Sequence, residues 1–547
     1  MINRYLMAKS LRWFEVNVFV LIAIISVIFL SLFNLPVWLH ITEIIHGLDN
    51  VSIGFVISLP FFLFAALNFI FTPFSFRFIL KPFFCFLFLS SSLVTYTTMK
   101  YGLVFDQSMI QNIVETNFSE ASSYFNLHIF LWFCLTGLLP SVLLVFLRIE
   151  YPCTCFRGGI YRLASMIVSL IIILIIAFFF YKDYASVGRN NPTLNKEIIP
   201  ANYIYSTVKY AKTLLSDKAV FREVGLDAVR KNKNDKPVLM FFIIGETARS
   251  ENFSLNGYVR ETNSFTSKID GVISFSDVFS CGTSTAVSVP CMFSDMSREQ
   301  FDSRQAANSE NVLDILKRTG VNILWIENDG GCKGVCKRLS VIDVKPSENR
   351  ILCNGKTCYD EILLESVDEK LKENRGDMFF AFHMIGSHGP TYYLRYPGEH
   401  RHFSPDCSRS DIENCSQEQL VNTYDNTIRY TDYVLSKMIR KLTEYNERYN
   451  TVLLYVSDHG ESLGEKGLYL HGTPYKFAPE QQIRVPLILW MSTDFIESKN
   501  INSQCLAENA IRNKYSHDNI FSTLLGVWDV STSVYDKEAD IFYPCRQ

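Results

Sequence analysis

Five long apolar runs before residue 182 constrain this chain more than any other feature. Each is close to the ~20 residues that an α-helix needs to cross a bilayer. The stretch from Val168 to Phe180 contains one serine and no polar face, so a buried helix of a soluble domain does not explain it. The runs extend over Val16–Phe33, Val51–Phe74, Phe83–Thr98, Leu127–Leu147 and Leu163–Tyr181. We therefore predict a five-helix transmembrane domain over residues 1–182.

The distribution of basic residues predicts the orientation of these helices. The first run is longer than a typical signal-peptide core and lacks a small-residue cleavage site, so we expect a retained anchor. Lysine and arginine gather before the first run, between the second and third, and between the fourth and fifth, which places the N-terminus in the cytoplasm. These residues are Lys9, Arg12, Arg77, Lys81, Arg148, Arg157 and Arg162. Five crossings then leave everything after about residue 182 outside.

Cysteine usage agrees with that placement. Ten of the 14 cysteines lie in the external part, an even number in close pairs, as is typical of an oxidising compartment. The expected pairs are Cys281–Cys291, Cys332–Cys336, Cys353–Cys358, Cys407–Cys415 and Cys505–Cys545. A zinc site built from the second and third pairs is the alternative, but its spacing and its external location disfavour it.

The rest of the chain divides into a bridge and a second domain. Residues 183–236 are polar and mixed, with an amphipathic helix predicted over Tyr203–Lys218 that would lie on the membrane surface. In residues 237–547, apolar runs such as Val238–Ile244 and Val485–Trp490 alternate with helical patterns, including a long amphipathic helix over Leu420–Leu442. This alternation predicts an α/β domain with a mostly parallel central sheet.

Metal-ligand side chains follow the predicted strands. In such sheets ligands bind beyond the carboxyl ends of the strands. Glu246 follows the first run, His388 the third, and Asp458 with His459 the fourth, while His471 comes shortly afterwards. A single Asp-His pair is more often a cap or a buried ion pair, but the recurrence at separate strand ends favours a zinc site.

A hydroxyl-rich loop between Cys281 and Cys291 offers a nucleophile for such a site. Its four hydroxyl side chains are Thr283, Ser284, Thr285 and Ser288. Zinc makes a serine or threonine oxygen a better nucleophile, and the following helix N-terminus suits a phosphoryl group. The competing interpretation is that these hydroxyls only cap the helix. Spacing alone does not choose among the four.

The motifs around these residues resemble a known family. They include Cys281-Gly-Thr-Ser-Thr285, Ser457-Asp-His-Gly-Glu-Ser-Leu-Gly464, Gly245–Tyr258, Asn328–Gly334 and Gly386–Thr391. Over essentially its full length the chain is similar to the lipid A phosphoethanolamine transferases of Gram-negative bacteria, the group associated with polymyxin resistance.

The resemblance implies a fold and a set of site residues. The second domain would be alkaline-phosphatase-like (sulfatase-like), and Thr285 would be the nucleophile. One tightly bound zinc ion would be held by Glu246, Thr285, Asp458 and His459. His388 and His471 would bind the transferred phosphate or a second zinc and assist catalysis, and Lys333 would contact the phosphoethanolamine group.

Three further positions match a substrate-binding pattern of that family. Asn112, Thr116 and Glu120 are four residues apart, so they share one face of a helix. Glu120 offers a carboxylate to an ethanolamine ammonium. Without the resemblance, an ordinary solvated helix face would be the simpler interpretation.

The implied reaction takes place at a bacterial inner membrane, with the catalytic domain in the periplasm. Phosphatidylethanolamine would donate phosphoethanolamine to Thr285, forming a covalent intermediate, and a phosphate of lipid A would accept it. The added ammonium would lower surface negative charge and weaken the binding of cationic peptides. We expect a monomer, and the net charge of −3 argues against a nucleic-acid partner.

Three other interpretations remain open from the sequence. The acceptor in the same chemistry could be a sugar of the lipopolysaccharide core. Water as the acceptor would make the protein a membrane-anchored phosphodiesterase, or a sulfatase, although neither Cys281 nor Cys291 lies in a sulfatase Cys-x-Pro-x-Arg setting. A receptor with an inactive hydrolase-like domain is the third, and it would lack some of the metal ligands.

Overall fold

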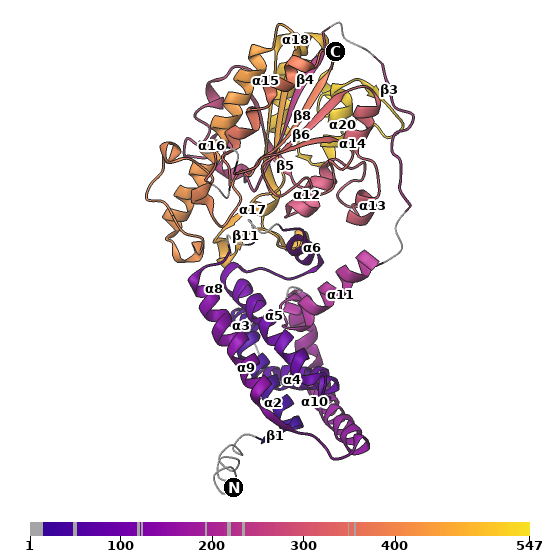
Figure 1. Ribbon diagram of the computed structural model, residues 1–547, viewed down its shortest axis with the longest axis vertical. Helices are drawn as coiled ribbons and strands as arrows, with labels where there is room; N and C mark the ends of the chain where they lie inside the picture. Colours follow the sequence, from indigo (N-terminus) through magenta and orange to yellow (C-terminus); the bar gives the residue numbers. More distant parts are fainter. Residues whose placement is uncertain are drawn as a thin grey trace, which may run out of the picture. The chain divides into compact units, whose positions relative to one another are not determined.

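The chain folds into two compact units, seen in a computed structural model (Figure 1). One unit contains residues 1–106 and 126–209, and the other contains residues 107–125 and 210–547. The segment 107–125 thus belongs to the unit that contains the C-terminal domain, although it lies between two apolar runs in the sequence. The structure describes residues 15–46, 52–116, 121, 124–191, 194–215, 220–231, 236–347, 349, 351–354 and 357–546.

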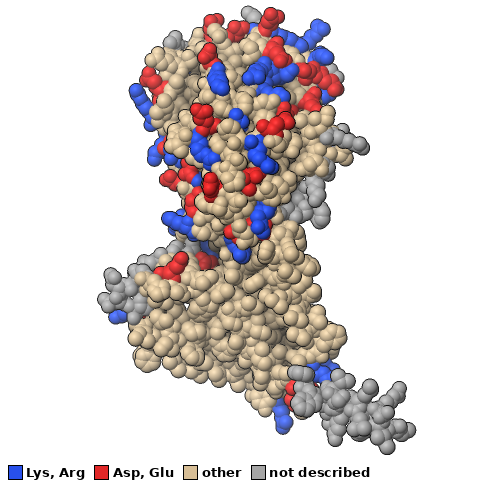
Figure 2. All heavy atoms as spheres, turned by 90° about the vertical axis from the view of Figure 1, so that its left-hand side faces the viewer, with Lys and Arg blue, Asp and Glu red and all other residues tan. Residues whose placement is uncertain are grey.

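The first unit is a bundle of apolar helices. In the described residues, four helical stretches are long and apolar enough to cross a membrane: Ile53–Phe74, Leu80–Tyr101, Leu127–Phe146 and Cys155–Tyr184. They correspond to α4 (Ile53–Phe71), α5 (Leu80–Tyr101), α8 (Leu127–Trp132) with α9 (Leu139–Phe146), and α10 (Cys155–Asn190). Figure 2 shows that the visible face of this unit is almost bare of charged side chains, as a lipid-facing surface requires.

The first predicted span is bent. Helix α2 (Val18–Ile28) continues as a π-helical turn to Phe33, and α3 (Leu35–His46) then leaves at 59°, so a fifth span exists only if this pair is one span. A π-turn followed by Pro36 is a common cause of such a kink. The buried Asn34 satisfies the broken backbone: its Nδ2 donates to the carbonyl oxygens of Phe29 (2.9 Å) and Ile199 (2.6 Å), and its Oδ1 accepts from Ile199 N (3.0 Å).

The second unit is built on an eight-stranded sheet. Its strand order is β13 (Tyr515–Ser516), β5 (Ile273–Phe279), β12 (Arg484–Met491), β9 (Asn450–Ser457), β4 (Val238–Gly245), β8 (Met378–His383), β6 (Asn322–Glu327) and β7 (Ser340–Asp343). The predicted strand Val238–Ile244 is confirmed in β4, whose residues are all buried. In Figure 1, α15 (Val367–Glu373) and α16 (Gln417–Glu444) lie on one side of the sheet, and α12 (Thr285–Met292), α14 (Val312–Arg318) and α20 (Asp518–Val527) lie on the other.

The sheet is mixed, which corrects the expectation that Val485–Trp490 forms a parallel strand. Strand β12 runs antiparallel to both of its neighbours, β5 and β9. The reason lies in the connection: the segment between β9 and β12 contains only short turns and a four-residue helix, α17 (Glu480–Ile483). A parallel return needs a longer crossover, usually through a helix, so the chain comes back beside β9 in the opposite direction.

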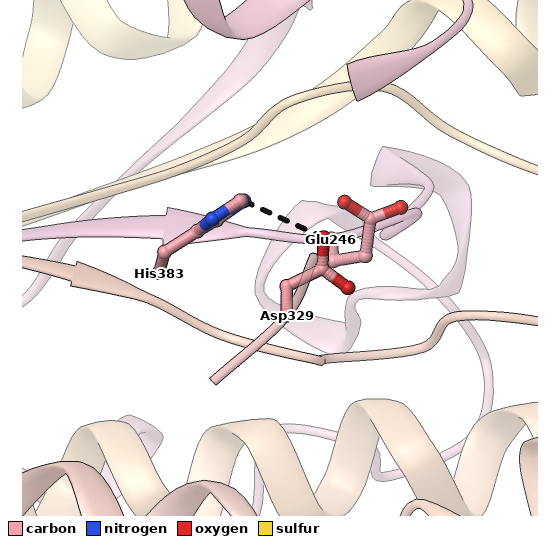
Figure 3. A group of neighbouring side chains, drawn as sticks. All are labelled: Glu246, Asp329 and His383. Carbon is pink, nitrogen blue, oxygen red and sulfur yellow. Dashed lines mark ion pairs between the residues drawn. The ribbon is translucent and has the colours of Figure 1, made fainter. Parts of the chain in front are cut away.

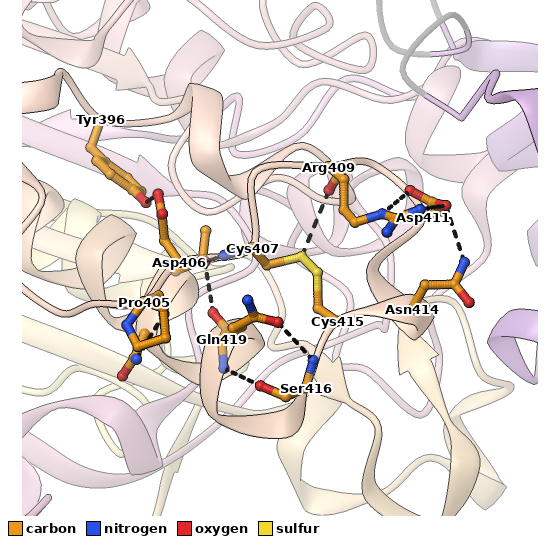
Figure 4. The surroundings of a disulfide bond; sticks show 12 residues. Tyr396, Pro405, Asp406, Cys407, Arg409, Asp411, Asn414, Cys415, Ser416 and Gln419 are labelled. Atoms are coloured by element: carbon orange, nitrogen blue, oxygen red, sulfur yellow. Dashed lines mark hydrogen bonds and ion pairs between the residues drawn. A yellow bond between two sulfur atoms is a disulfide. The ribbon is translucent and has the colours of Figure 1, made fainter.

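All five predicted disulfides are present: Cys281–Cys291, Cys332–Cys336, Cys353–Cys358, Cys407–Cys415 and Cys505–Cys545. Two of these bonds consume the cysteines of the alternative zinc site, which is therefore wrong. Figure 4 shows how one of them secures the start of α16: Cys415 precedes Ser416, which forms a capping box with Gln419. The long helix predicted over Leu420–Leu442 is confirmed within α16.

The bridge contains the helix that its pattern indicated. Helix α11 (Ala201–Leu215) covers most of the predicted Tyr203–Lys218, and residues 216–219 lie outside the described part of the chain. That this helix lies on the membrane surface stays a prediction.

Candidate active site

The carboxyl ends of two central strands bring the main cluster together. Strands β4 and β9 are parallel neighbours, and their register pairs Gly245 with Ser457. The next residues, Glu246 and Asp458, therefore emerge side by side, and Asp458 N donates to the Gly245 carbonyl at 2.9 Å. Both side chains are fully buried. The placement of ligands beyond strand ends, predicted from sequence, follows directly from this register.

Glu246, Asp458 and His459 form a cluster suited to a cation. One ligand atom from each lies within 4.8 Å of the others. His459 Nε2 is 3.3 Å from Asp458 Oδ2 and 3.5 Å from Glu246 Oε1. In metal sites built from such residues, imidazole nitrogen and carboxylate oxygen are typical zinc ligands.

His459 has the properties of a neutral ligand. Its Nδ1 donates to the Gly460 carbonyl at 2.8 Å, which leaves the lone pair on Nε2. Burial lowers the pKa of His459 to about 4, so the imidazole stays uncharged at neutral pH. Neither His459 Nε2 nor Asp458 Oδ2 makes a hydrogen bond to any described residue. Buried polar atoms of this kind are costly unless a partner satisfies them, and a divalent cation fits this donor set.

Thr285 is the loop hydroxyl that reaches this cluster. It is the first residue of α12, and its Oγ1 donates to Glu246 Oε2 at 3.2 Å. Thr283 Oγ1 instead donates to the Thr473 carbonyl at 2.7 Å, and Ser288 Oγ accepts from Gly282 N at 3.0 Å. Ser284 is the N-cap of the helix, but its side chain makes no capping bond. Among the four hydroxyls, Thr285 is thus the one that donates to a carboxylate of the cluster, and its role as the nucleophile stays a prediction.

The two predicted histidines lie next to the cluster. The ring of His471 has its centroid 4.3 Å from that of His459, and the His388 ring is 5.8 Å from His471. His471 Nδ1 lies 3.4 Å from Glu461 Oε2, an ion-pair or hydrogen-bond distance. Both His388 and His471 are nearly inaccessible to solvent. That these two histidines hold a phosphate oxygen or move a proton stays a prediction.

Lys333 and helix α6 (Gln107–Glu115) border a neighbouring cavity of about 70 Å³. Its walls include Gln111 and Glu115 from α6 as well as Lys333. Sequence reasoning missed Gln111 and Glu115. Gln111 and Glu115 are four residues apart and so share a face of α6, which was the available signal. The motif match instead indicated the adjacent face with Asn112 and Thr116.

The three substrate positions predicted on this segment are partly described. Asn112 lies within α6, and Thr116 follows it and donates from Oγ1 to the Asn112 carbonyl at 2.7 Å. Glu120 lies outside the described residues. Helix α6 is held close to the active-site loop, since a Cβ on Gly472 would come within 2.6 Å of Met109 Cε. Gly472 has a φ of +89°, which also favours glycine there.

A second cluster was missed by sequence reasoning. Glu246, Asp329 and His383 also place one ligand atom each within 4.8 Å of the others (Figure 3). His383 Nδ1 lies 2.9 and 3.0 Å from the two carboxylate oxygens of Glu327, and Nε2 lies 3.9 Å from Asp329 Oδ2. Burial alone would lower the pKa of His383, but the Glu327 carboxylate outweighs it and raises the pKa to about 9. The signal was a histidine inside the apolar run 378–385.

His517 is another residue that no motif indicated. Its Nδ1 accepts from Cys281 N at 3.1 Å, and its Nε2 donates to the Ser457 carbonyl at 3.0 Å. Burial lowers the pKa of His517 to about 4, so the neutral ring can accept at one nitrogen while it donates at the other. His517 thus connects the nucleophile loop to the end of β9, one residue before Asp458.

Comparisons with known proteins cover both units. The model described as "Phosphoethanolamine transferase EptA/EptB" matches residues 63–215, and the Sulfatase model matches residues 239–530. The chain is 43% identical to phosphoethanolamine transferase EptA of Escherichia coli strain K12 over 509 residues, 92% of each protein. It is 37% identical to phosphatidylethanolamine transferase Mcr-1 of Escherichia coli over 554 residues, which is 98% of this chain and 100% of that protein.

A solved structure agrees over nearly the whole length. The integral membrane lipooligosaccharide phosphoethanolamine transferase A from Neisseria meningitidis superimposes with a TM-score of 0.94 and 37% sequence identity. The match covers 96% of this chain and 99% of the other. The arrangement of a helical membrane unit followed by a sulfatase-like domain is therefore shared.

Proposed function

The chain belongs to the phosphoethanolamine transferase family, and on that premise we propose that it transfers phosphoethanolamine from phosphatidylethanolamine to a phosphate of lipid A. The family resemblance predicted from the motifs is confirmed. The protein is a multi-pass membrane enzyme with its catalytic domain in the periplasm. Addition of an ammonium to lipid A reduces surface negative charge, so the expected result is resistance to polymyxin and other cationic peptides.

One observation supports this chemistry above all others: Thr285 Oγ1 lies 3.2 Å from Glu246 Oε2, beside Asp458 and His459. A threonine hydroxyl needs activation to act as a nucleophile. The Glu246 carboxylate accepts its hydrogen bond and so orients the hydroxyl oxygen in the cluster. Because Thr285 begins α12, the amides of the first helical turn also face an incoming anion.

We propose Zn²⁺ as the resident metal ion, held by Glu246, Thr285, Asp458 and His459. The buried donor set of two carboxylates, one neutral imidazole and one hydroxyl fits a four-coordinate zinc site. When bound, the ion supplies Lewis-acid stabilisation of negative charge on the transferring phosphoryl group. The hydrogen bond from His459 Nδ1 to the Gly460 carbonyl keeps the proton on Nδ1, so Nε2 is free to bind the metal ion.

The first half-reaction forms a covalent intermediate. Thr285 Oγ1 attacks the phosphorus of phosphatidylethanolamine, and its proton passes to His388 or His471. The bond between phosphorus and the diacylglycerol oxygen breaks, and that oxygen takes a proton from His388 or His471. The products are diacylglycerol and a phosphoethanolamine ester of Thr285.

The second half-reaction reverses these roles. An oxygen of a lipid A phosphate attacks the phosphorus and passes its proton to His388 or His471, the bond to Thr285 Oγ1 breaks, and the threonine oxygen takes up that proton from the histidine. The ammonium of Lys333 offers charge compensation to the phosphoethanolamine group near the loop that carries it. Burial of Thr285, His388 and His471, which are 4–5% exposed, limits the access of water and favours transfer over hydrolysis.

Because every residue of the site comes from one chain, we propose that a monomer is the functional unit. Size-exclusion chromatography with light scattering of active, detergent-solubilised enzyme tests this. Activity confined to a dimeric fraction would contradict it.

The decisive experiment uses the purified full-length enzyme in detergent with a fluorescent phosphatidylethanolamine. We expect release of fluorescent diacylglycerol, and, with lipid A added, an increase in the mass of lipid A by one phosphoethanolamine group. The Thr285→Ala variant should lose both, whereas Ser284→Ala, which removes a hydroxyl without a capping bond, should retain both. Diacylglycerol release with free phosphoethanolamine and unmodified lipid A would identify a phosphodiesterase instead.

A further inference from the structure

The carboxylate of Glu246 belongs to two clusters, and only one of them has a role in the reaction above. The second cluster combines Glu246 with Asp329 and His383. We propose that this second cluster binds a further divalent cation, so that Glu246 bridges two metal ions. The inference concerns metal binding and does not depend on which lipid accepts phosphoethanolamine.

The sheet builds this second cluster from three adjacent strands. Strands β4, β8 and β6 are neighbours in that order, and all three are parallel to one another. Glu246 follows β4, His383 ends β8, and Asp329 lies two residues beyond the end of β6. In Figure 3 the His383 ring points toward the carboxylate of Asp329, with Glu246 beside it. The cluster thus lies at the carboxyl ends of three adjacent parallel strands of the central sheet.

The orientation of His383 is that of a metal ligand. Both oxygens of Glu327 face His383 Nδ1, at 2.9 and 3.0 Å, so this nitrogen donates, and Nε2 offers its lone pair when a metal ion displaces its proton. His383 is fully buried, and its Nε2 makes no hydrogen bond to any described residue. In metal sites, a binding histidine usually donates from one ring nitrogen to a carboxylate and binds the metal with the other. His383 has this arrangement, with Glu327 at Nδ1 and Asp329 on the side of Nε2.

The Glu327 carboxylate is itself held in one orientation by two hydrogen bonds. Its Oε2 accepts from the Trp325 indole at 2.8 Å, and its Oε1 accepts from Asp329 N at 2.9 Å. The second of these bonds ties the carboxylate behind His383 to the backbone of the next candidate ligand. One short segment, residues 325–329, therefore orients the histidine and supplies Asp329.

The charge of the region also calls for a second cation. One divalent ion at Glu246, Asp458 and His459 balances the two carboxylates of that cluster. The buried Glu327 and the partly buried Asp329 are then left beside a histidine that is neutral when it binds metal, and the Lys333 ammonium, which acts on Asp329, offsets only one of the two negative charges. Buried carboxylates without a compensating charge are costly, and a further divalent cation supplies that charge.

The ligand types indicate the class of ion. Two carboxylate oxygens and one imidazole nitrogen suit Zn²⁺ or Mn²⁺ better than a hard ion such as Ca²⁺. A cation there would withdraw charge from Glu246, and so adjust the basicity of the carboxylate that accepts the Thr285 hydrogen bond. The competing explanation of the same geometry is an imidazolium at His383 that pairs with Glu327 and Asp329.

Zinc content of the purified full-length protein tests the proposal. After dialysis against zinc and removal of the excess, mass spectrometry of the metal should find about two ions per chain. Asp329→Asn and His383→Gln should each lose about one ion, and so should Asp458→Asn, which affects the first cluster. The matched control is Asp425→Asn, a buried carboxylate bound by Asn252 and Tyr258 away from both clusters, which should keep the native content.

Other outcomes would overturn the proposal. A native content of one ion that Asp329→Asn and His383→Gln leave unchanged would show that no cation binds there. Loss of the second ion in His471→Gln but not in Asp329→Asn would assign it to the other histidines. Circular dichroism of each variant confirms folding, and ¹⁵N NMR provides an independent readout: a His383 imidazolium in the presence of zinc would favour the ion-pair explanation. If the native enzyme binds two ions but transfers no phosphoethanolamine, the proposed function is contradicted and this inference stays intact.

Discussion

Thr285 Oγ1 and Glu246 Oε2 lie 3.2 Å apart, although Thr285 begins a helix and Glu246 follows the central strand β4. One local and one long-range feature hold the loop in place. The disulfide between Cys281 and Cys291 closes the loop around the start of α12, and the ring of His517 ties Cys281 to Ser457 at the end of β9. The nucleophile is therefore positioned by covalent and hydrogen-bonded links to the same sheet that carries its acceptor.

Removal of the Thr285 hydroxyl should abolish the first half-reaction. We expect Thr285→Ala to lower diacylglycerol release by about 10³-fold or more, because Thr285 Oγ1 is the oxygen that would form the bond to phosphorus. Thr285→Ser should retain part of the activity, since it keeps the oxygen but not the methyl group that restricts its rotamer. Trapping of a phosphoethanolamine adduct on residue 285 by mass spectrometry in native and Thr285→Ser enzyme, but not in Thr285→Ala, completes the test. An adduct on Ser284 or Thr283 would refute the assignment.

Metal removal should lower both activity and stability. A chelator leaves the buried carboxylates of Glu246 and Asp458 without a compensating charge, so we expect the thermal midpoint of the catalytic domain to fall. Added Zn²⁺ should restore the midpoint and the transferase activity, whereas Mg²⁺ should restore neither, because it prefers oxygen ligands and retains its water. An unchanged midpoint and full activity in excess chelator would contradict a metal-dependent site.

The disulfide at the nucleophile loop should matter for activity as well as stability. The double substitution Cys281→Ser with Cys291→Ser should reduce the free energy of unfolding by about 2–3 kcal/mol. It should also lower kcat, because the start of α12 is no longer held at Glu246. The matched control is Cys407→Ser with Cys415→Ser, since the two bonds span similar separations of 10 and 8 residues. The control should lose stability but keep kcat; an equal loss of kcat in both would mean that the loop bond has no special role.

Local signals explain what the sequence could predict. The apolar runs, the closely spaced cysteine pairs and the side chains directly after strands are all properties of short segments. Glu246, Asp458 and His459 were found because each follows a strand, and the parallel register of β4 and β9 then unites them. The disulfide pairs were found because in four of the five the partners are at most ten residues apart.

Long-range pairing explains what the sequence could not predict. The direction of β12 depends on the route of the chain after β9. A continuous apolar run is compatible with a parallel or an antiparallel strand, so the sequence of β12 does not reveal its direction. His383 lies inside an apolar run, and only the register that pairs it with Glu327 on β6 reveals a second cluster. His517 is 236 residues from Cys281, so no local pattern connects them.

His517 should make the stability of the catalytic domain depend on pH. Burial lowers its pKa to about 4, whereas an unfolded chain has a histidine pKa near 6.5. Between these values the unfolded state binds more protons, so stability rises with pH in this window. The contribution of His517 is complete above about pH 6.5 and is lost as the pH falls toward 4.

We therefore expect His517→Gln to be less stable than the native protein at pH 7.5, with a difference that shrinks as the pH falls toward 5. Thermal unfolding of both proteins across that range measures the effect. The matched control is His402→Gln, an exposed histidine, which should reproduce the native pH profile. His517→Gln should also lower kcat more than it changes KM, because it disturbs the position of the nucleophile loop and not a group that contacts substrate. A pH-independent difference in stability, together with an unchanged kcat, would show that His517 merely fills space.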